Sequence, residues 1–409
     1  MIYDVAIVGA GAAGLAAARR LRFSALRAIV LEARDRLGGR AHTITHAPSL
    51  ALDLGCEWLH SADRNPLVPL AKELGFGVDS TLPRWGEQAG NRGFPVADQR
   101  AFQTALQRFE DRIADAARTD HDEPAANYFD PACRWNPLIN AFSSYYNGVA
   151  FEHVSILDYA AYDDSGVNWR IPQGLGTMIA ALGAGCEIAL GSPLTDIDHS
   201  GPMLRLHTAK GPVEGRTAIV TVPTSLIATE RLRFHPALPA KIAAAAGLPL
   251  GLADKLFLAV KNAALMPENS HAFGRADRAE TGSYLFRPAG QPYIECFFGG
   301  ETARSLEEEG PGGFVVFALE ELSNLFGSAV RGALHPLATT SWGMDPFAAG
   351  SYSYARPGHH GDRARLGEAV DGRLFFAGEA CSERSFSTAH GAYETGVRAA
   401  EEAMAAIRV

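Results

Sequence analysis

The sequence predicts an α/β fold, and three observations near the N-terminus lead to that prediction. The run IYDVAIV is short, apolar and rich in β-branched residues, which is typical of a buried strand. The segment AAGLAAARRLR follows a glycine-rich turn, and its alanines and leucines favour a helix packed against a sheet. The next run, ALRAIVLE, indicates a second strand. Two strands joined by a helical crossover this early in the chain predict a parallel pair in a right-handed βαβ unit.

Farther along the chain, helical and strand-like segments alternate. A helix-rich stretch at about 100–118 precedes a passage rich in proline and aromatic residues near 131–146, which indicates an insertion. Strand-like runs return at LRLHTA, TAIVTVP, DKLFLAV, PYIECFFGG and GRLFFAGEA. Helices are expected at about 241–246 and 391–407. Because no repeat, low-complexity tract or linker divides these runs, we expect any second domain to be interleaved with the first.

Composition limits the class of protein. The chain has 409 residues, 47% of them hydrophobic, which is enough for a large core without disulfide staples. A net charge of -9 argues against a general nucleic-acid binder and would favour the approach of a cationic substrate. Neither a signal peptide nor a membrane anchor is visible. The cysteines are scattered and odd in number, which predicts a reducing compartment and no zinc site; they are Cys56, Cys133, Cys186, Cys296 and Cys381. We expect a soluble cytoplasmic protein without a metal.

A glycine motif lies between the first strand and the first helix. Gly9, Gly11 and Gly14 form GxGxxG, in which the first glycine permits a tight turn, the second admits a pyrophosphate, and the third lets helix and strand pack closely. Glu32 ends the second strand, where a carboxylate can accept hydrogen bonds from a ribose diol. With both strands and the helix in place, this pattern predicts a dinucleotide site rather than a structural turn.

The segment ARDRLGGR continues this cradle beyond Glu32. Its residues Arg34, Gly38, Gly39 and Arg40 follow the ribose-binding acid in a way that is typical of flavoproteins rather than of simple NAD dehydrogenases. Taken alone, the segment fits equally well with a glycine turn flanked by solvated arginines.

Four separated blocks of the chain resemble the flavin amine-oxidase family, which includes monoamine oxidases, polyamine oxidases and lysine-specific histone demethylases. The blocks are the N-terminal cradle, LDLGCEWLHSADRNPL, DKLFLAV, and SWGMDPFAAGSYSYARPG through GRLFFAGEACSERSFSTAHGAYETG. The resemblance implies a Rossmann-type FAD-binding domain of the glutathione-reductase kind at 1–78, 172–238 and 345–409. It implies an interleaved α+β substrate-binding domain at 79–171 and 239–344.

The resemblance also implies which residues hold FAD. The segment LGCEWLH would pass beside the isoalloxazine ring, and Glu379 would contact the ribityl or phosphate region. Ala389 would give a backbone N–H to the flavin pyrimidine at the start of the last helix, where the helix N-terminus can stabilise negative charge. With the cradle residues named above, the complete expected set adds Ala12, Ala13, Ala33, Gly55, Cys56, Glu57, Trp58, Leu194, Trp342, Gly378 and Thr388.

Lys255 interrupts the apolar run DKLFLAV, and the chain contains only five lysines. Because a buried ammonium is costly unless it is partnered or neutralised, the residues alone favour an edge position with the amine in solvent. The resemblance reverses that preference, since it matches Lys255 to the family's strand lysine, which holds a water against flavin N5. We therefore expect Lys255 to be catalytic.

Further cavity residues are implied by the resemblance. His60 matches a histidine of several polyamine oxidases, although a lone histidine is as often structural. Tyr352 would wall the cavity above the flavin. Thr388 stands where monoamine oxidases have a second aromatic wall, so the cage is expected to be open on one side. Ser351 stands where they carry the flavin-linking cysteine, so FAD is expected to be noncovalent.

Asp163 and Asp164 lie where polyamine oxidases and demethylases carry acidic residues near the cavity. Paired carboxylates there could hold the distal cation of a long substrate. A solvated turn before a strand explains the same residues, and that interpretation is slightly favoured.

The function implied is an FAD-dependent amine oxidase. A neutral primary or secondary amine, polyamine-like or aryl-alkyl, gives hydride from its α-carbon to flavin N5, and O2 reoxidises the cofactor with release of peroxide. The alternatives are a flavin oxidase or desaturase of a non-amine substrate, and a flavin-bearing interaction protein. The particular amine, the C–N bond attacked and the oligomeric state stay open.

Overall fold

The computed structural model of the chain describes residues 2–47 and 50–408. The larger sheet has the strand order β11-β8-β9-β10-β1-β2-β7, and β17 pairs with β10. Its strands are β1 (Ile2–Val8), β2 (Ala28–Leu31), β7 (Ile188–Ala189), β8 (Leu194–Asp198), β9 (Leu204–Thr208), β10 (Gly211–Val220), β11 (Arg233–His235) and β17 (Leu374–Phe376). Strands β2, β1, β10 and β17 run parallel, as the N-terminal pattern predicts.

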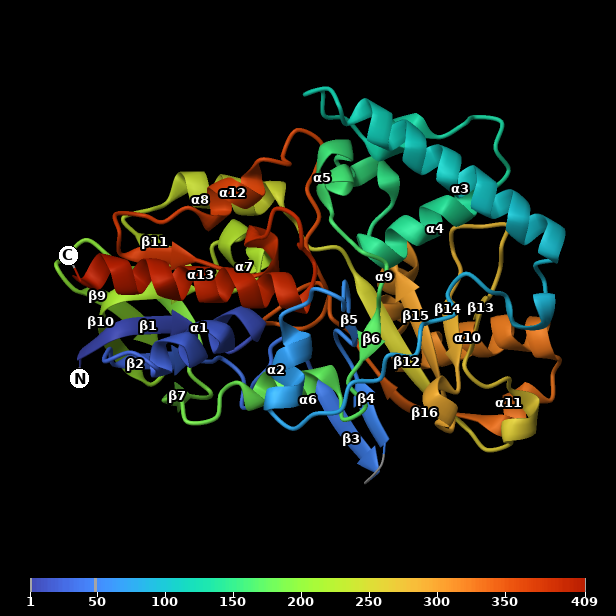
Figure 1. The fold of residues 1–409 in the computed structure, drawn as a ribbon, viewed down its shortest axis with the longest axis horizontal. Coiled ribbons are helices and arrows are strands. Elements are labelled where there is room, and N and C mark those ends of the chain that lie inside the picture. Colours follow the sequence, from blue (N-terminus) through green and yellow to red (C-terminus); the bar gives the residue numbers. More distant parts are fainter. Residues whose placement is uncertain (1, 48–49, 409) are drawn as a thin grey trace.

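Helices cover both faces of this sheet, so its central strands are buried on both sides. Helix α1 (Ala12–Arg22) packs along α13 (Ala389–Arg408) on one face, near α6 (Leu175–Ala181). On the other face lie α7 (Thr224–Ala228), α8 (Pro239–Gly247) and α12 (Asp362–Gly367). Figure 1 shows this half at the left, with both chain ends at its outer edge. The predicted α/β class and Rossmann-type unit are confirmed.

The smaller sheet has the order β13-β14-β15-β12-β16 and is antiparallel. Its strands are β12 (Ala253–Val260), β13 (Ser270–Phe273), β14 (Ser283–Phe286), β15 (Tyr293–Gly299) and β16 (Leu334–Thr339). Helices α9 (Gly300–Glu309), α10 (Pro311–Phe326) and α11 (Val330–Ala333) pack with one face, which leaves the opposite face for other contacts.

A helical layer lies above this sheet in Figure 1. It contains α3 (Val96–Ala116), α4 (Asn136–Tyr146) and α5 (Ile156–Ala161), held by a core rich in phenylalanine. The remaining elements are α2 (Leu67–Glu73), the β3–β4 hairpin (Thr43–Ala47 and Leu50–Asp53), and the β5–β6 pair (Trp58–Leu59 and Trp169–Arg170). The passage at 131–146, expected as an insertion, therefore supplies α4.

The strands of the larger sheet named above all lie within 1–78, 172–238 and 345–409, the ranges expected for the FAD-binding domain. One helix departs from the expected boundaries. Helix α8 belongs by sequence to 239–344, yet Ala244, Ala245 and the following Leu248 pack in the core of the larger sheet. Across the described residues, none of the helices combines the length and apolar character needed to cross a membrane.

Candidate active site

A single cavity of about 1050 Å³ is lined by residues of both sheets and of the helical layer. At one end it is lined by the glycine cradle of β1 and α1. At the other end it is lined by the free face of the smaller sheet and by aromatic side chains of α4 and α5. Most of the residues expected to bind FAD or substrate line it, and the exceptions are Gly14 and Asp163.

Each of the three cradle positions is occupied by glycine for a different structural reason. Gly9 has a φ of 101°, which favours glycine. A Cβ on Gly14 would lie 1.9 Å from the Gly9 carbonyl oxygen, so Gly14 allows α1 to pack against β1 without facing the cavity itself. A Cβ on Gly11 would meet nothing closer than 4.0 Å, and Gly11 lines the cavity, so this position leaves room for a phosphate group near the N-terminus of α1.

Glu32 is buried at the end of β2 and fixes the loops of the cradle. Its carboxylate accepts hydrogen bonds from the backbone N–H groups of Ala10 at 2.7 Å and Arg34 at 2.8 Å. The Arg34 guanidinium pairs with Asp345 at 2.6 Å and lies 5.3 Å from the centre of the Phe347 ring. Arg34 is thus held by the C-terminal part of the chain rather than solvated.

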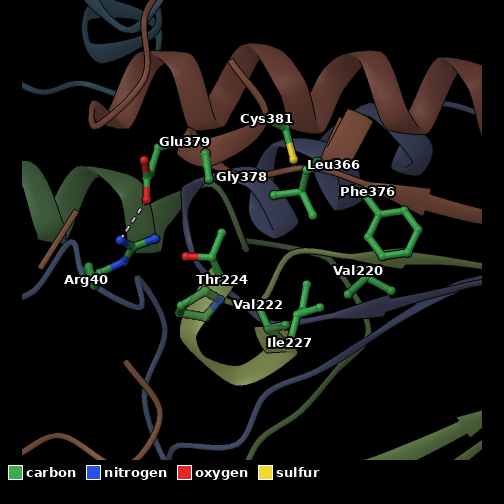
Figure 2. Close-up of a pocket in the computed structure, with 13 residues that line it drawn as sticks. Arg40, Val220, Val222, Thr224, Ile227, Leu366, Phe376, Gly378, Glu379 and Cys381 are labelled. Atoms are coloured by element: carbon green, nitrogen blue, oxygen red, sulfur yellow. Dashed lines mark hydrogen bonds and ion pairs between the residues drawn. The ribbon is translucent and has the colours of Figure 1, made fainter. Parts of the chain in front are cut away.

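Arg40 joins the N-terminal and C-terminal blocks. Its guanidinium donates to the Ser351 carbonyl oxygen at 2.7 Å and to a Glu379 carboxylate oxygen at 2.9 Å. Figure 2 shows this ion pair at the edge of a small side cavity whose walls include Val220 and Phe376. The neighbouring Arg40 guanidinium helps to hold the pKa of Glu379 below its usual range although burial opposes this.

The loop after β4 runs close to the cradle. A Cβ on Gly55 would lie 1.7 Å from the Arg40 carbonyl oxygen, so only glycine fits there. The Trp342 indole donates to the Leu54 carbonyl oxygen at 3.0 Å and thereby ties this loop to the C-terminal block. Burial raises the pKa of the Cys56 thiol to about 12, so Cys56 lines the cavity as a neutral thiol.

Lys255 lies on the cavity face of β12, which is paired on both sides by β15 and β16. Its side chain is 7% exposed, so the edge position in solvent is wrong. The ammonium donates to the Asp53 carbonyl oxygen at 3.1 Å and to Glu57 at 3.0 Å, and it lies 2.7 Å from Glu295. These carboxylates raise the pKa of Lys255 in spite of burial, so the amine is an ammonium.

Glu295 belongs to the same buried cluster and was missed by sequence reasoning. A signal existed, because Glu295 interrupts the apolar run YIECFFGG as Lys255 interrupts DKLFLAV. Arg170 completes the cluster, with a guanidinium nitrogen 2.8 Å from Glu57 and the guanidinium carbon 4.0 Å from the centre of the Trp58 ring. Four ionisable side chains thus lie together, and three of them, Glu57, Lys255 and Glu295, line the cavity.

The other expected catalytic residues also line the cavity, and hydrogen bonds to neighbouring residues hold their side chains. The His60 ring lies 2.6 Å from the Asn168 side-chain oxygen, and burial lowers the pKa of the imidazole. Tyr352 donates its hydroxyl to the Tyr145 carbonyl oxygen. Thr388 precedes α13 and accepts a hydrogen bond from the Gly391 N–H at 3.0 Å, as an N-terminal cap does. Ala389 begins that helix and lines the cavity.

The two acidic neighbours expected near the substrate are separated by the structure. Asp164 lines the cavity and accepts hydrogen bonds from the Ser61 hydroxyl and the Gly166 N–H, both at 3.0 Å. Asp163 points elsewhere and pairs with Arg64 at 2.6 Å, both side chains being partly exposed. Only Asp164 is therefore placed to meet a ligand in this cavity.

Aromatic side chains that the sequence did not single out line the end of the cavity away from the glycine cradle. A second acidic side chain, Glu110 on α3, also lines it. These aromatic residues come from segments far apart in the chain; they are Trp85, Phe142, Tyr145, Tyr146, Tyr159, Tyr162, Phe273, Phe297 and Phe386. The chamber can enclose an apolar or cationic organic molecule, since aromatic faces attract cations.

The residues present fit a dinucleotide of the flavin type. The open space above Gly11 and the buried Glu32 suit a pyrophosphate and a ribose, and the cavity continues past the loop at 54–58 to the N-terminus of α13. The fold and site therefore define a flavin-dependent oxidoreductase with a chamber lined by aromatic side chains.

The chain belongs to the flavin containing amine oxidoreductases, whose family model matches residues 12–121 and 91–404. It is 28% identical to the probable polyamine oxidase 4 of Arabidopsis thaliana, over 97% of this chain and 86% of that protein. It is 29% identical to the lysine-specific histone demethylase 1 homolog 3 of Oryza sativa subsp. indica, over 97% of this chain and 53% of that protein.

Solved structures show the same fold. Cyclohexylamine oxidase from Brevibacterium oxydans superposes with a TM-score of 0.80 at 20% identity, covering all of both chains. A putrescine oxidase bound to putrescine superposes with a TM-score of 0.77 at 20% identity, covering 99% of each chain. The family, the flavin cofactor and the class of reaction expected from the sequence are thereby confirmed: the protein is an FAD-dependent amine oxidoreductase.

Proposed function

We propose that this enzyme oxidises a primary or secondary amine, polyamine-like or aryl-alkyl, with noncovalent FAD and with O2 as the electron acceptor. The observation that carries the proposal is the single cavity that joins the glycine cradle, the Lys255 cluster and the aromatic chamber. FAD bound in the cradle would supply the redox chemistry by accepting hydride from the amine α-carbon and passing the electrons on to oxygen.

The chain's own residues would bind and orient the amine. Aromatic walls exclude water and attract the cationic form during entry, and Asp164 and Glu110 add negative potential inside the chamber. The Lys255 and Arg170 cations disfavour a second ammonium next to them, which favours the neutral amine required for oxidation. The chamber can therefore bind a cation near Asp164 and Glu110 and hold a neutral amine near the Lys255 cluster.

Noncovalent binding is supported at Ser351, which stands between the cofactor side of the cavity and β12. Its hydroxyl accepts from the Ala253 N–H and donates to the Ala253 carbonyl oxygen, both at 2.8 Å. A hydroxyl so bonded offers no thiol for a link to flavin. The cytoplasmic location is likewise our proposal, supported by the free state of the cysteines in the described residues.

Anaerobic mixing of purified holoenzyme with single amines tests the proposal. Putrescine, spermidine, phenylethylamine and cyclohexylamine cover the substrate classes named above, and oxidation of any of them bleaches the visible flavin spectrum. Readmission of oxygen should restore the spectrum and release one peroxide per turnover. Flavin that stays oxidised with every amine in the panel would contradict amine oxidation by this chain.

Asp164→Asn distinguishes the two substrate classes, with Asp163→Asn as a matched control. If the substrate is a diamine whose far ammonium lies near Asp164, the variant raises KM for putrescine by about tenfold, since a charge-assisted contact contributes about 1.5 kcal/mol or more. KM for phenylethylamine should hardly change. Asp163→Asn breaks only the surface pair with Arg64, so both KM values should stay near those of the wild type. Equal effects of the two substitutions would refute the assignment.

A further inference from the structure

The buried cluster beside the cofactor site contains one carboxyl group whose role the family resemblance does not explain. Glu295 lies on β15, and Lys255 lies on the adjacent β12, diagonally across the pair of strands. Both side chains point to the cavity face of the sheet, as do Phe297 and Leu285. Glu295 is 6% exposed, so its carboxyl group is nearly out of contact with bulk water.

Each N–H group of the Lys255 ammonium can be matched to an oxygen atom of the protein. The ammonium carries three N–H groups. Three oxygen atoms surround it, from the Asp53 carbonyl, Glu57 and Glu295, at 3.1, 3.0 and 2.7 Å. A water held by Lys255 would have to displace one of these partners. By contrast, the second oxygen of Glu295, Oε2, has no hydrogen-bond partner among the described residues, although it is buried.

The two carboxyl groups of the cluster are not equivalent. Glu57 is contacted by two cations, Lys255 at 3.0 Å and Arg170 at 2.8 Å. Among the described residues, Glu295 is paired with one cation, Lys255, and it also interacts with the Glu57 carboxylate. When both carboxyls are ionised the cluster is neutral, and when one is protonated it carries one positive charge. Because Glu57 has the greater stabilisation, the proton belongs on Glu295.

We propose that Glu295 is a positioning residue for amine oxidation, which anchors the Lys255 ammonium through Oε1 and, by holding or releasing a proton on Oε2, sets the charge of the cluster beside the cofactor. The inference rests on the proposed function and deepens it. The step is acid–base only: the O–H bond of Glu295 breaks, water in the cavity accepts the proton, and no electrons move.

The protonated cluster favours the reaction in two ways. Its positive charge disfavours the ammonium form of a nearby substrate and so favours the neutral amine. The same charge stabilises the negative charge that develops on the cofactor as it is reduced. Burial and the Glu57 carboxylate raise the pKa of Glu295 to about 8, so the change of charge falls within reach of ordinary assays.

Other groups near the cluster titrate at different pH or keep their charge. Arg170 and Lys255 stay cationic and Glu57 stays ionised, its pKa being lowered to about 2 by Arg170 and Lys255 in spite of burial. Burial raises the pKa of Asp53 to about 6. Asp254 has a pKa raised to about 7 by burial but does not line the cavity. Burial also raises the pKa of Tyr293, which places its ionisation above that of Glu295.

The test is the midpoint potential of the bound flavin measured against pH from 6 to 10, by chemical reduction without amine. The wild type should show a bend near pH 8, and Glu295→Gln, which cannot ionise, should lack it. Glu321→Gln is the matched control. Glu321 is also a buried carboxyl, bonded to the Tyr284 hydroxyl at 2.7 Å and the Gly282 N–H at 2.9 Å, and it does not line the cavity. The bend should survive in that control.

The limiting rate of flavin reduction by saturating amine gives a second readout. At pH 10, two units above the bend, only about 1% of the wild type keeps the proton, so the rate constant should fall by up to about 100-fold. Glu295→Gln should show no such fall in rate between pH 7 and 10. Glu295→Asp retains a carboxyl one methylene shorter and should move the bend rather than remove it, which covers the case that the glutamine variant loses FAD.

A bend near pH 8 that persists in Glu295→Gln, or that Glu295→Asp leaves at the same pH, would overturn the assignment, as would a wild type without any bend. Failure of the proposed function is a separate result, because the potential is measured without amine. If the bend behaves as expected and no amine bleaches the flavin, Glu295 keeps its role in the cluster and amine oxidation does not hold.

Discussion

Lys255→Met removes the ammonium from a cluster in which it lies 3.0 Å from Glu57 and 2.7 Å from Glu295. Removing one partner of a buried ion pair typically costs about 3–5 kcal/mol of stability. The cost should be near the lower limit at pH 7, because Glu57 keeps its contact with Arg170 and Glu295 can stay protonated. We therefore expect a loss of about 3 kcal/mol in the free energy of unfolding at pH 7.

The loss of stability caused by Lys255→Met should grow with pH, and the size of the increase follows from the protons that Glu295 binds in the folded and unfolded states. A glutamate in the unfolded chain is ionised above about pH 4.3, while folded Glu295 keeps its proton, so stability falls by about 1.4 kcal/mol per pH unit until Glu295 ionises. In the wild type, this fall in the free energy of unfolding ends near pH 8, where folded Glu295 ionises. Without Lys255 the pKa of Glu295 rises further, so the fall continues. The deficit of the variant should increase by about 1.4 kcal/mol between pH 8.5 and 9.5.

Urea unfolding at pH 7, 8.5 and 9.5, with excess FAD present, measures this deficit. Lys261→Met is the matched control, because Lys261 follows β12 directly but is exposed. Its free energy of unfolding should stay within about 0.5 kcal/mol of the wild type at every pH. A deficit for Lys255→Met that is constant from pH 7 to 9.5, or that is absent, would refute the reasoning. Anaerobic mixing of the same FAD-loaded variant with amine should show a large fall in the rate of flavin reduction.

Substitutions at three further positions test other parts of the site. Gly14→Ala places a Cβ 1.9 Å from the Gly9 carbonyl oxygen, so it should destabilise the protein by about 3 kcal/mol and yield colourless preparations, as absorbance at 450 nm will show. Thr388→Ala removes the hydrogen bond to the Gly391 N–H and should cost about 1 kcal/mol in urea unfolding, whereas Thr388→Ser should cost little. The pKa of Glu57 is lowered to about 2, so its contribution to stability is present above pH 4.5 and is lost as the pH falls toward 2. Glu57→Gln should remove roughly 3 kcal/mol of that acid-side pH dependence; an unchanged acid unfolding curve would count against the pairing.

Local sequence patterns were sufficient for the cradle. The roles of Gly9, Gly11 and Gly14 depend on residues at most five positions apart, and Glu32 ends a strand that begins only four residues earlier. Each of these roles is a property of one strand–turn–helix–strand unit. Local pattern predicted the strand that carries Lys255 but not its burial, which was expected only from the family resemblance.

Contacts between residues far apart in the chain could not be predicted from local sequence patterns. Glu57 and Glu295 contact Lys255 although they are 198 and 40 positions away, and Arg170 joins the cluster through Glu57; nothing in their local sequences specifies these contacts. Glu295 had a visible signal, an acid in an apolar strand, but its partner could be named only from the register of β15 against β12.

Asp163 and Asp164 are adjacent in the sequence, yet the sequence could not predict which of them lines the cavity. Their identical chemistry gave no reason to separate them, yet one pairs with Arg64 at the surface and the other lines the cavity. The sequence by itself determined the α/β class and the glycine cradle, because these follow from backbone geometry over a few residues, whereas the burial of Lys255 was expected only from the family resemblance. Only the tertiary structure decided the charge cluster and the aromatic chamber, because their contacts come from strand register and helix packing between segments far apart in the chain.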